Sequence, residues 1–139
     1  MEINVIKWIM NIRFIRGENL AINFRRKGEC IVMIVKQKEV AVEELGAGVS
    51  RKMLAHQGGM MAVEVVFEKG AIGTAHTHPH EQISYILEGS FEYTIEGVIY
   101  KLEKGDTYYV PPEAVHGVVA LEKSVILDVF TPQRADFLK

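Results

Sequence analysis

The sequence predicts an all-β fold made of short antiparallel strands. Apolar or alternating runs of strand length recur along the chain after residue 33, and Gly, Pro and charged turn residues separate them. No part of this region shows a strong helical period. Strands at nearly regular spacing between such turns are typical of an antiparallel sandwich or a small barrel.

The elements follow from the positions of these runs and turns. Glu96-Gly97 and Glu122-Lys123 each separate two strands and predict two hairpins. A proline pair at 111–112 ends a strand, because proline cannot donate to a strand ladder. Residues 43–49 are expected to form a glycine-containing loop, and residues 135–138 a short helix. The expected strands are residues 35–42, 60–67, 82–87, 91–95, 98–102, 107–110, 115–121 and 125–130.

The composition is that of one soluble globular domain. The chain has 139 residues, of which 48% are hydrophobic and 24% charged, so a disordered or low-complexity chain is excluded. No apolar run reaches the roughly 18–20 residues that a membrane helix needs. The net charge of -2 argues against a nucleic-acid binder, and the single cysteine, Cys30, cannot form an internal disulfide. A cytoplasmic protein that acts without nucleic acid or membrane is expected.

The segment 1–32 differs from the remainder of the chain. It carries six Lys or Arg and three Glu, a charge of +3, whereas residues 33–139 carry ten Lys or Arg and fifteen Asp or Glu, a charge of -5. A secretory signal is disfavoured because Asn11 and Arg13 interrupt the apolar stretch and no small-residue cleavage site follows.

Two interpretations of this segment remain. One is an amphipathic arm or an added strand, with a possible helical face formed by Ile3, Ile6, Trp8, Ile9, Ile12 and Ile15. The favoured one is that translation starts at Met33, because residues 25–30 can be encoded by a purine-rich stretch that resembles a bacterial ribosome-binding site. The expected organisation is therefore an uncertain extension, residues 1–32, and one domain, residues 33–139.

Histidines cluster in the middle of this domain. Four of the five lie between positions 76 and 116: His76, His78, His80 and His116. In an extended chain alternate side chains share a face, so His76 and His78 converge and Gln82 has the same parity. Antiparallel neighbours in a barrel would bring His116, at the start of a later strand, opposite this pair.

Such a constellation predicts a metal site. Two imidazoles on one strand face and a third from a distant strand suit a divalent first-row metal, so His76, His78 and His116 are the expected ligands. His80 and Glu81 are second-rank candidates. Glu81 faces away in a regular strand, although the proline before His80 could rotate the backbone, and His80 serves equally well as a structural residue.

The same residues carry a resemblance to the cupin family. Gly70, His76, His78, Gln82 and Gly89 match the spacing of the first cupin motif, with Gln82 at the usual Glu ligand position. Gly105, Pro111 and His116 match the second motif, and the short segment 90–104 separates the two. The resemblance implies a single-domain double-stranded β-helix, or jelly-roll barrel, with a metal in its mouth and Gln82 as its fourth ligand.

Three positions depart from the cupin pattern. Two of them, Glu113 for Gly and Ala120 for Asn, concern turn shape rather than ligation. Gln82 in place of Glu leaves the metal charge uncompensated, which favours Lewis-acid work on an anionic substrate and disfavours an iron oxygenase with two His and one carboxylate. This donor set tolerates zinc, nickel, manganese and iron(II) alike. Zinc or nickel is the expected metal, with manganese or iron as alternatives.

A closer resemblance is to the pectin-degradation cupins called KdgF. It rests on the sequences HTHPHEQISY (76–85), VHGV (115–118) and DVFTPQR (128–134), and residues 46–52 fit the family as well. Members of that family open and ketonise 4,5-unsaturated monouronates, which lyases release from pectin or alginate, to linear deoxy-keto-uronates. The resemblance therefore implies a metal-dependent isomerase of carbohydrate metabolism that takes a small anionic sugar acid and forms a homodimer.

The resemblance also implies catalytic roles. Asp128, Phe130 and Arg134 match the family's catalytic positions by order and spacing, as a proton carrier, a pocket wall and a bidentate holder of the substrate carboxylate. Without the resemblance, Asp128 is expected to cap a turn, Phe130 to lie in the core and Arg134 to be solvated. Arg51 either lines the pocket or pairs with an acidic strand residue, and His56 is expected in a surface loop. Four tyrosines are expected in the core or the barrel wall: Tyr85, Tyr93, Tyr108 and Tyr109. One of these tyrosines could donate a hydrogen bond to a sugar hydroxyl.

Two other functions stay open at this point. One is a different metal cupin, such as a dioxygenase, a cyclase or an isomerase of a small acid. The other is a non-catalytic cupin that binds a small acid. The fold alone does not separate them, because cupins carry many unrelated functions.

Overall fold

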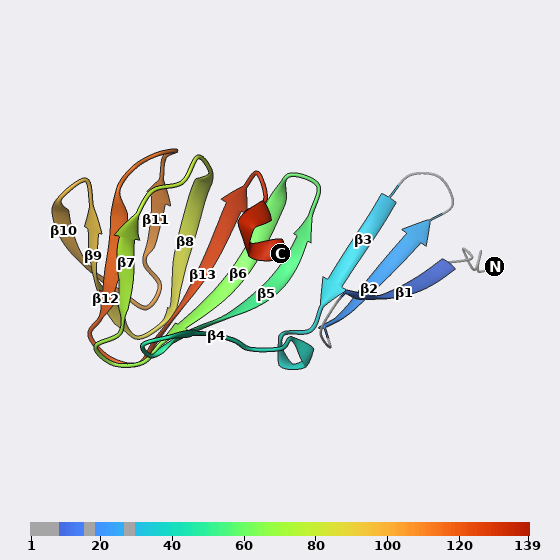
Figure 1. Cartoon of the computed structure of the whole chain (residues 1–139), viewed down its shortest axis with the longest axis horizontal. Helices are drawn as coiled ribbons and strands as arrows, with labels where there is room; N and C mark the ends of the chain where they lie inside the picture. The colour runs from blue at the N-terminus through green and yellow to red at the C-terminus, as the bar shows by residue number, and fades with distance from the viewer. Residues whose placement is uncertain (1–8, 16–18, 27–29) are drawn as a thin grey trace, which may run out of the picture. The chain divides into compact units, whose positions relative to one another are not determined.

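The structure, a computed structural model, describes residues 9–15, 19–26 and 30–139, with side chains from residue 32 onward (Figure 1). The chain divides into two compact units, Met1–Ala41 and Val42–Lys139. The boundary expected from the sequence lies earlier, between residues 32 and 33. A start of translation at Met33 stays a prediction.

The first unit is a three-stranded antiparallel sheet. Its strands are β1 (Ile9–Ile15), β2 (Asn19–Arg26) and β3 (Cys30–Val35). Residues 9–15 are therefore extended, as the added-strand interpretation expects, and do not form a helical face. Residues 3, 6 and 8 of that predicted face lie outside the described residues.

The strand expected at residues 35–42 is wrong beyond Val35. A short 3-10 helix, η1 (Gln37–Glu39), follows β3, and an irregular segment leads to the second unit. Residues 36–39 are all exposed, whereas Val40 is buried. A strand with one buried face needs apolar side chains at every second position, and this charged run does not supply them.

The second unit consists of two antiparallel sheets. The six-stranded sheet has the order β11-β8-β13-β6-β5-β4, and the four-stranded sheet the order β10-β9-β12-β7. A second 3-10 helix, η2 (Ala135–Leu138), ends the chain. The strands are β4 (Glu43–Gly46), β5 (Val49–Gln57), β6 (Met60–Phe67), β7 (Ile72–His76), β8 (Glu81–Glu88), β9 (Ser90–Ile95), β10 (Val98–Glu103), β11 (Thr107–Val110), β12 (His116–Ala120) and β13 (Ser124–Thr131).

The core lies between the two sheets. Phe67 on β6 and Phe91 on β9 meet edge to face with ring centroids 5.3 Å apart, and both are buried. Ile86 and Ile126 from the six-stranded sheet and Ala120 from the four-stranded sheet complete this cluster. Burial of apolar side chains from both sheets in one cluster holds the sandwich together, and it confirms the all-β expectation.

Most of the expected strands are confirmed, and two of them, 60–67 and 107–110, have the expected bounds. The loop expected at residues 43–49 is wrong, because residues 43–46 form the edge strand β4. The long strand β5 was not expected, and His56 lies on it rather than in a surface loop. Arg51, Lys52 and His56 interrupt the apolar alternation in β5 and hide its strand character.

The hairpin expected at Glu122-Lys123 is also wrong. The strands on either side of it, β12 and β13, belong to different sheets, so this connection crosses from one sheet to the other. The crossing is tight, because a Cβ on Gly89 would stand 2.0 Å from the Ser124 hydroxyl, and Gly89 has a φ of +79°. Glycine is therefore required there. The other expected hairpin, β9 with β10 around Glu96-Gly97, is confirmed.

No helix in the described ranges is both long enough and apolar enough to cross a membrane.

Candidate metal centre and substrate pocket

Three histidines converge where β7 ends and β12 begins. His76 and His116 are register partners across the β7–β12 ladder, and their ring centroids lie 4.5 Å apart. His78, in the loop after β7, has its ring centroid 5.6 Å from that of His76 and 4.9 Å from that of His116. One nitrogen from each ring lies within 4.8 Å of the others. The three rings are therefore close enough to share one cation.

Backbone carbonyls orient all three rings in the same way. The Nδ1 atoms of His76, His78 and His116 lie 2.9 to 3.0 Å from the carbonyl oxygens of residues 74, 80 and 114 respectively. A carbonyl oxygen only accepts hydrogen bonds, so each Nδ1 carries the proton and each Nε2 of the neutral ring keeps a lone pair. This is the arrangement that histidine metal ligands commonly show.

Burial favours the neutral form of two of the three rings, those of His78 and His116. It lowers the pKa of His116 to about 4, and the charges of His76, His78 and Arg134 add to this lowering. Burial also lowers the pKa of His78, against an opposing hydrogen bond with Gln82. The Nε2 atom of His116 is buried without a hydrogen-bond partner among the described residues. A lone pair left in this state is what a metal ion would satisfy.

Gln82 supplies a fourth donor atom beside the triad. Its Nε2 donates to Asp128 Oδ1 at 3.1 Å and to Ser84 Oγ at 2.9 Å, so its Oε1 points the other way, 2.9 Å from His78 Nε2. With His78 neutral, a carbonyl lone pair and an imidazole lone pair face each other. A shared cation resolves that contact, so the residues present fit a divalent metal.

Strand register brings the Asp128 carboxyl to the same place. In the β8–β13 ladder Asp128 pairs with Ser84, and Phe130 pairs with Gln82, so all four lie on the inner face. The Ser84 hydroxyl donates to Asp128 Oδ1. Burial raises the pKa of Asp128 to about 6, although the hydrogen bonds from Ser84 and Gln82 oppose the rise. A carboxyl with such a pKa can both take up and release a proton near neutral pH.

Arg134 and two phenylalanines form another side of the site. Arg134 is 8% exposed and lies just before η2, where its Nε and Nη2 bond the two Asp136 carboxylate oxygens at 3.1 and 2.8 Å. Its Cζ lies 5.3 Å from the ring centre of Phe130 and 4.3 Å from that of Phe137. The guanidinium is therefore held by stacking and by one carboxylate, and its Nη1 is not used by Asp136.

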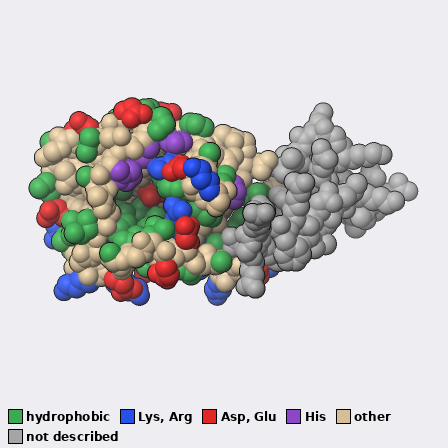
Figure 2. All heavy atoms as spheres, viewed as in Figure 1, with side chains coloured by type: hydrophobic (Ala, Val, Ile, Leu, Met, Phe, Trp, Pro, Cys, Tyr) green, Lys and Arg blue, Asp and Glu red, His purple; other side chains and the backbone are tan. Residues whose placement is uncertain are grey.

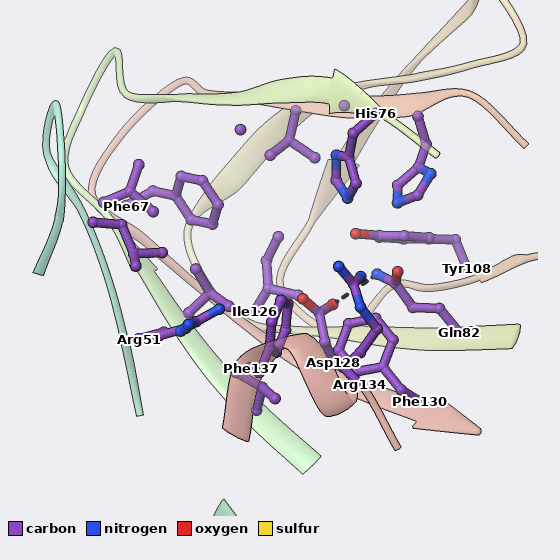
Figure 3. Close-up of a pocket in the computed structure, with 18 residues that line it drawn as sticks. Arg51, Phe67, His76, Gln82, Tyr108, Ile126, Asp128, Phe130, Arg134 and Phe137 are labelled. Carbon is purple, nitrogen blue, oxygen red and sulfur yellow. Dashed lines mark hydrogen bonds between the residues drawn. The ribbon is translucent and has the colours of Figure 1, made fainter. Parts of the chain in front are cut away.

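These groups line one cavity of about 180 Å³. Figure 2 shows it as a hollow in this face of the second unit, with histidines at its rim and hydrophobic side chains inside. In Figure 3 His76 and Gln82 lie at one end and Phe67 at the other, with Asp128 between them. Pockets for drug-sized ligands span roughly 300–1,000 Å³, so this one suits a smaller molecule.

The sequence-predicted residues do not all meet here. The predicted catalytic residues Asp128, Phe130 and Arg134 line the cavity. The predicted ligands His76, His116 and Gln82 line it as well, and buried His78 adjoins it. His80 stands outside the triad, with its ring centroid 5.6 Å from that of His78, although its Nδ1 is buried without a partner among the described residues. Glu81 is exposed and accepts a hydrogen bond from the Tyr109 hydroxyl at 2.8 Å.

Phe137 and Tyr108 also line the cavity, and Ser84 bonds the lining residue Asp128. Of these three, the sequence singled out only Tyr108, as a core or barrel-wall residue. Ser84 shares the parity of Gln82 on one strand, so alternation would have indicated it. Tyr108 stacks on buried Tyr93 with centroids 4.1 Å apart, and burial raises its pKa well above the usual value. Phe137 follows the last strand, and no local pattern indicates that η2 returns it to the pocket.

Comparisons with known proteins identify the family of this chain. Residues 63–130 match the family model described as a cupin domain. The pectin degradation protein KdgF of Dickeya dadantii is 50% identical over 102 residues, which are 72% of this chain and 93% of that protein. The chain belongs to the KdgF family of cupins. The cupin fold and the histidine triad together support a divalent metal in this member of the family.

Two solved cupin structures are similar to this chain. The structure of KdgF from Halomonas sp. is 40% identical, with a TM-score of 0.72, and the match covers 75% of this chain and 96% of that one. An RmlC-like cupin from Shewanella frigidimarina is 39% identical, with a TM-score of 0.73, over 75% and 94% of the two chains. Both matches cover nearly all of the solved chains.

Proposed function

We propose that this KdgF-family cupin opens and ketonises 4,5-unsaturated monouronates, the sugar acids that lyases release from pectin or alginate. The observation that carries the proposal is the Asp128 carboxyl, with its raised pKa, beside an arginine and a histidine triad in one cavity. The KdgF relative from Dickeya dadantii is named a pectin degradation protein. A sugar acid also suits a small cavity that holds a guanidinium.

The reaction is an isomerisation, so no atom or electron is gained or lost. The bond between the ring oxygen and C1 breaks, C1 becomes an aldehyde, and the ring oxygen stays on C5 as an enol. The enol then becomes a ketone as a proton moves to C4. The residues must therefore hold the carboxylate, move a proton and stabilise negative charge on the enol oxygen.

Arg134 is the group that we assign to the substrate carboxylate. Its guanidinium is planar and always charged, and stacking on Phe130 and Phe137 fixes its direction. Phe130 also forms the wall between Arg134 and His78, with its ring centroid 5.6 Å from that of His78. This wall limits water beside the reacting atoms.

Asp128 is the group that we assign to proton transfer. Ser84 and Gln82 both donate to its Oδ1, which leaves Oδ2 to take a proton from the sugar and return it at C4. A site that only binds an anion gains nothing from a carboxylate inside the cavity, so Asp128 favours catalysis over the small-acid binding alternative.

The metal would be held by His76, His78, His116 and Gln82, as zinc or nickel, with manganese or iron as alternatives. When bound, it would supply Lewis acidity toward the substrate's oxygens. The amide at Gln82 weighs against the dioxygenase alternative, because non-haem iron oxygenases commonly use two histidines and a carboxylate.

We also propose that the protein acts in the cytoplasm as a homodimer. The linear keto-uronate feeds central metabolism, which supports the cytoplasm. Large apolar side chains on β8 and β11 support a partner surface: Ile83, Tyr85 and Tyr109 are 56%, 41% and 51% exposed. Sedimentation of the purified protein should give the mass of two chains, and a single-chain mass would contradict the dimer.

The test of the function follows the 4,5 double bond, whose ultraviolet absorbance disappears on ketonisation. Metal-loaded protein should remove the absorbance of freshly prepared pectin- or alginate-derived monouronate faster than buffer does, without consuming oxygen. The proposal fails if neither substrate is converted faster than in buffer. Oxygen uptake with iron would favour the dioxygenase instead.

A further inference from the structure

A second guanidinium lines the same cavity. Arg51 lies on β5, its side chain is 13% exposed, and it borders the pocket together with Arg134. Figure 3 shows Arg51 at the end that holds Phe67, away from His76 and Gln82. The roles assigned above to the histidines, Asp128 and Arg134 leave Arg51 without one.

Arg51 is held as firmly as Arg134. Its Nε and Nη2 bond the two Glu43 carboxylate oxygens at 2.6 and 3.0 Å, which leaves Nη1 unused by Glu43. Its Cζ lies 4.1 Å from the ring centre of Phe137, the ring on which Arg134 also stacks at 4.3 Å. Phe137 lies between the two arginines in Figure 3. One aromatic ring therefore fixes two guanidiniums at different places along the pocket.

The surroundings of Arg51 are otherwise apolar. Its register partner on β6 is Val65, which lines the cavity together with Val49 and Phe67. A largely buried charge is costly there, and a Met or Leu would pack against this wall without that cost. A ligand that accepts a hydrogen bond from Arg51 Nη1 would explain why an arginine stands at this position.

The Arg51 guanidinium is paired with a carboxylate, and this pairing indicates which ligand atoms it can bind. Glu43 is half exposed and compensates Arg51, so the pair brings little net charge into the cavity. Such a donor suits neutral oxygens as well as anions. In a monouronate whose carboxylate lies at Arg134, the oxygens at the opposite end are hydroxyls.

Resting on the proposed function, we infer that Arg51 binds the sugar hydroxyls at the end of the monouronate remote from its carboxylate. Its position at the end of a cavity of about 180 Å³ also sets the length of ligand that fits. Arg51 is then a specificity residue that selects a single sugar acid.

Binding of two probes to metal-loaded protein tests this inference directly. D-galacturonate has a carboxylate and a full set of ring hydroxyls but no 4,5 double bond, whereas glycolate is a short hydroxy acid. By calorimetry, Arg51→Met should weaken galacturonate binding about tenfold or more and leave glycolate binding within about twofold, since a hydrogen bond to a charged group is lost. Arg134→Met should weaken both.

Kinetics separate substrate binding from a structural role. With the unsaturated monouronate, Arg51→Met should raise KM about tenfold and change kcat little, which marks uniform binding. A lower kcat at unchanged KM would instead assign Arg51 to holding Phe137 and would overturn the inference. Unchanged galacturonate binding, or equal weakening of both probes, would overturn it as well.

Two further variants serve as a matched control and as a substitute for Arg51→Met. Lys52→Met removes a cation from the neighbouring position of β5, outside the cavity lining, and should leave both probes and both kinetic constants unchanged. If Arg51→Met does not fold, Arg51→Lys should raise KM by a smaller factor, because lysine lacks the planar fork.

The outcomes also separate this inference from the proposed function. Protein that binds galacturonate through Arg51 but opens no unsaturated uronate would refute the function and keep the site. Active protein that is indifferent to Arg51→Met would keep the function and refute the site. Protein that neither binds galacturonate nor opens the ring would refute both.

Discussion

Gln82 connects the histidine triad with the Asp128 carboxyl. Its amide oxygen faces His78 Nε2 while its amide nitrogen donates to Asp128 Oδ1. A glutamate, the usual cupin residue, would place a carboxylate oxygen against Asp128 where the amide now donates. Two adjacent carboxylates repel, and one of them would stay protonated. In the proposed site, Gln82 therefore has two effects: it donates to the proposed proton carrier Asp128, and it adds no negative charge beside the metal.

Replacing this amide by an acid should separate metal binding from turnover. We expect Gln82→Glu to retain metal, because a carboxylate is a good ligand, and to lower kcat about tenfold or more, because Asp128 loses its donor. Elemental analysis and the double-bond assay give the two readings. Gln57→Glu, at an exposed position, is the matched control. A fully active Gln82→Glu protein would contradict this role.

Asp128 should be needed for proton transfer and not for folding. Asn has nearly the same shape and keeps an acceptor for the Ser84 hydroxyl, but it carries no exchangeable acid proton. Loss of a general acid–base group costs about 10²–10⁴-fold, so kcat of Asp128→Asn should fall by that range with metal content unchanged. Glu122→Gln, at an exposed carboxylate, should leave kcat unaltered. Activity of Asp128→Asn within a few-fold of the parent would exclude the assigned role.

Single residues differ in how far the sequence reveals them. Alternation along an extended chain predicts that His76 and His78 share a face, and the structure brings both to His116. The contact of Phe137 with two arginines depends on how η2 folds back after β13, and no local pattern carries that information. Assignment of the metal ligands and the catalytic trio stays a prediction until variants are measured.

At the scale of elements, the register between β8 and β13 brings together Asp128, the proposed proton carrier, and its neighbours. Ser84 pairs with Asp128, and Gln82 pairs with Phe130. A slip of one residue would move the inward set on one strand to the outer face of the sheet. Strands such as β6 and β11 were predictable from continuous apolar or aromatic runs. The long strand β5 was not, because Arg51, Lys52 and His56 interrupt its apolar alternation.

The turn before β12 carries a strained residue at a position where the cupin pattern has glycine. Glu113 has a φ of 64°, and its N–H donates to the His78 carbonyl at 2.8 Å. A side chain in the left-handed region costs about 1–2 kcal/mol, partly offset by the extra freedom that glycine gives the unfolded chain. The turn that holds a candidate ligand loop is therefore less stable than it could be.

Restoring glycine in this turn should stabilise the protein. We expect Glu113→Gly to raise the free energy of unfolding by about 1 kcal/mol and to leave activity unchanged, because the exposed side chain lies outside the cavity lining. Urea denaturation measures the difference. Glu113→Ala, which keeps a Cβ, should give no such gain. A destabilised Glu113→Gly protein would show that the side chain matters more than the backbone strain.

At the scale of the whole molecule, the site belongs to the second unit. All the residues that line the cavity lie within Val42–Lys139. We expect a chain that starts at Met33 to keep the kcat/KM of the full chain within about twofold, since it contains this unit complete. The double-bond assay on both purified chains measures this. A large loss of activity in the shorter chain would mean that the segment 1–32 contributes to function.

The central claim is that the histidine triad and Asp128 pocket perform metal-dependent opening of unsaturated monouronates. Its most direct measurement is the rate at which the double-bond absorbance disappears. This rate is measured for the protein as purified, after a chelator has removed the metal, and after the metal has been reloaded. His116→Ala is assayed in parallel, and the metal content of each sample is determined. The account predicts rapid loss with loaded protein, a rate close to buffer after stripping, recovery on reloading, and neither metal nor activity in His116→Ala. Stripped protein as fast as loaded protein, or loaded protein no faster than buffer, would contradict it.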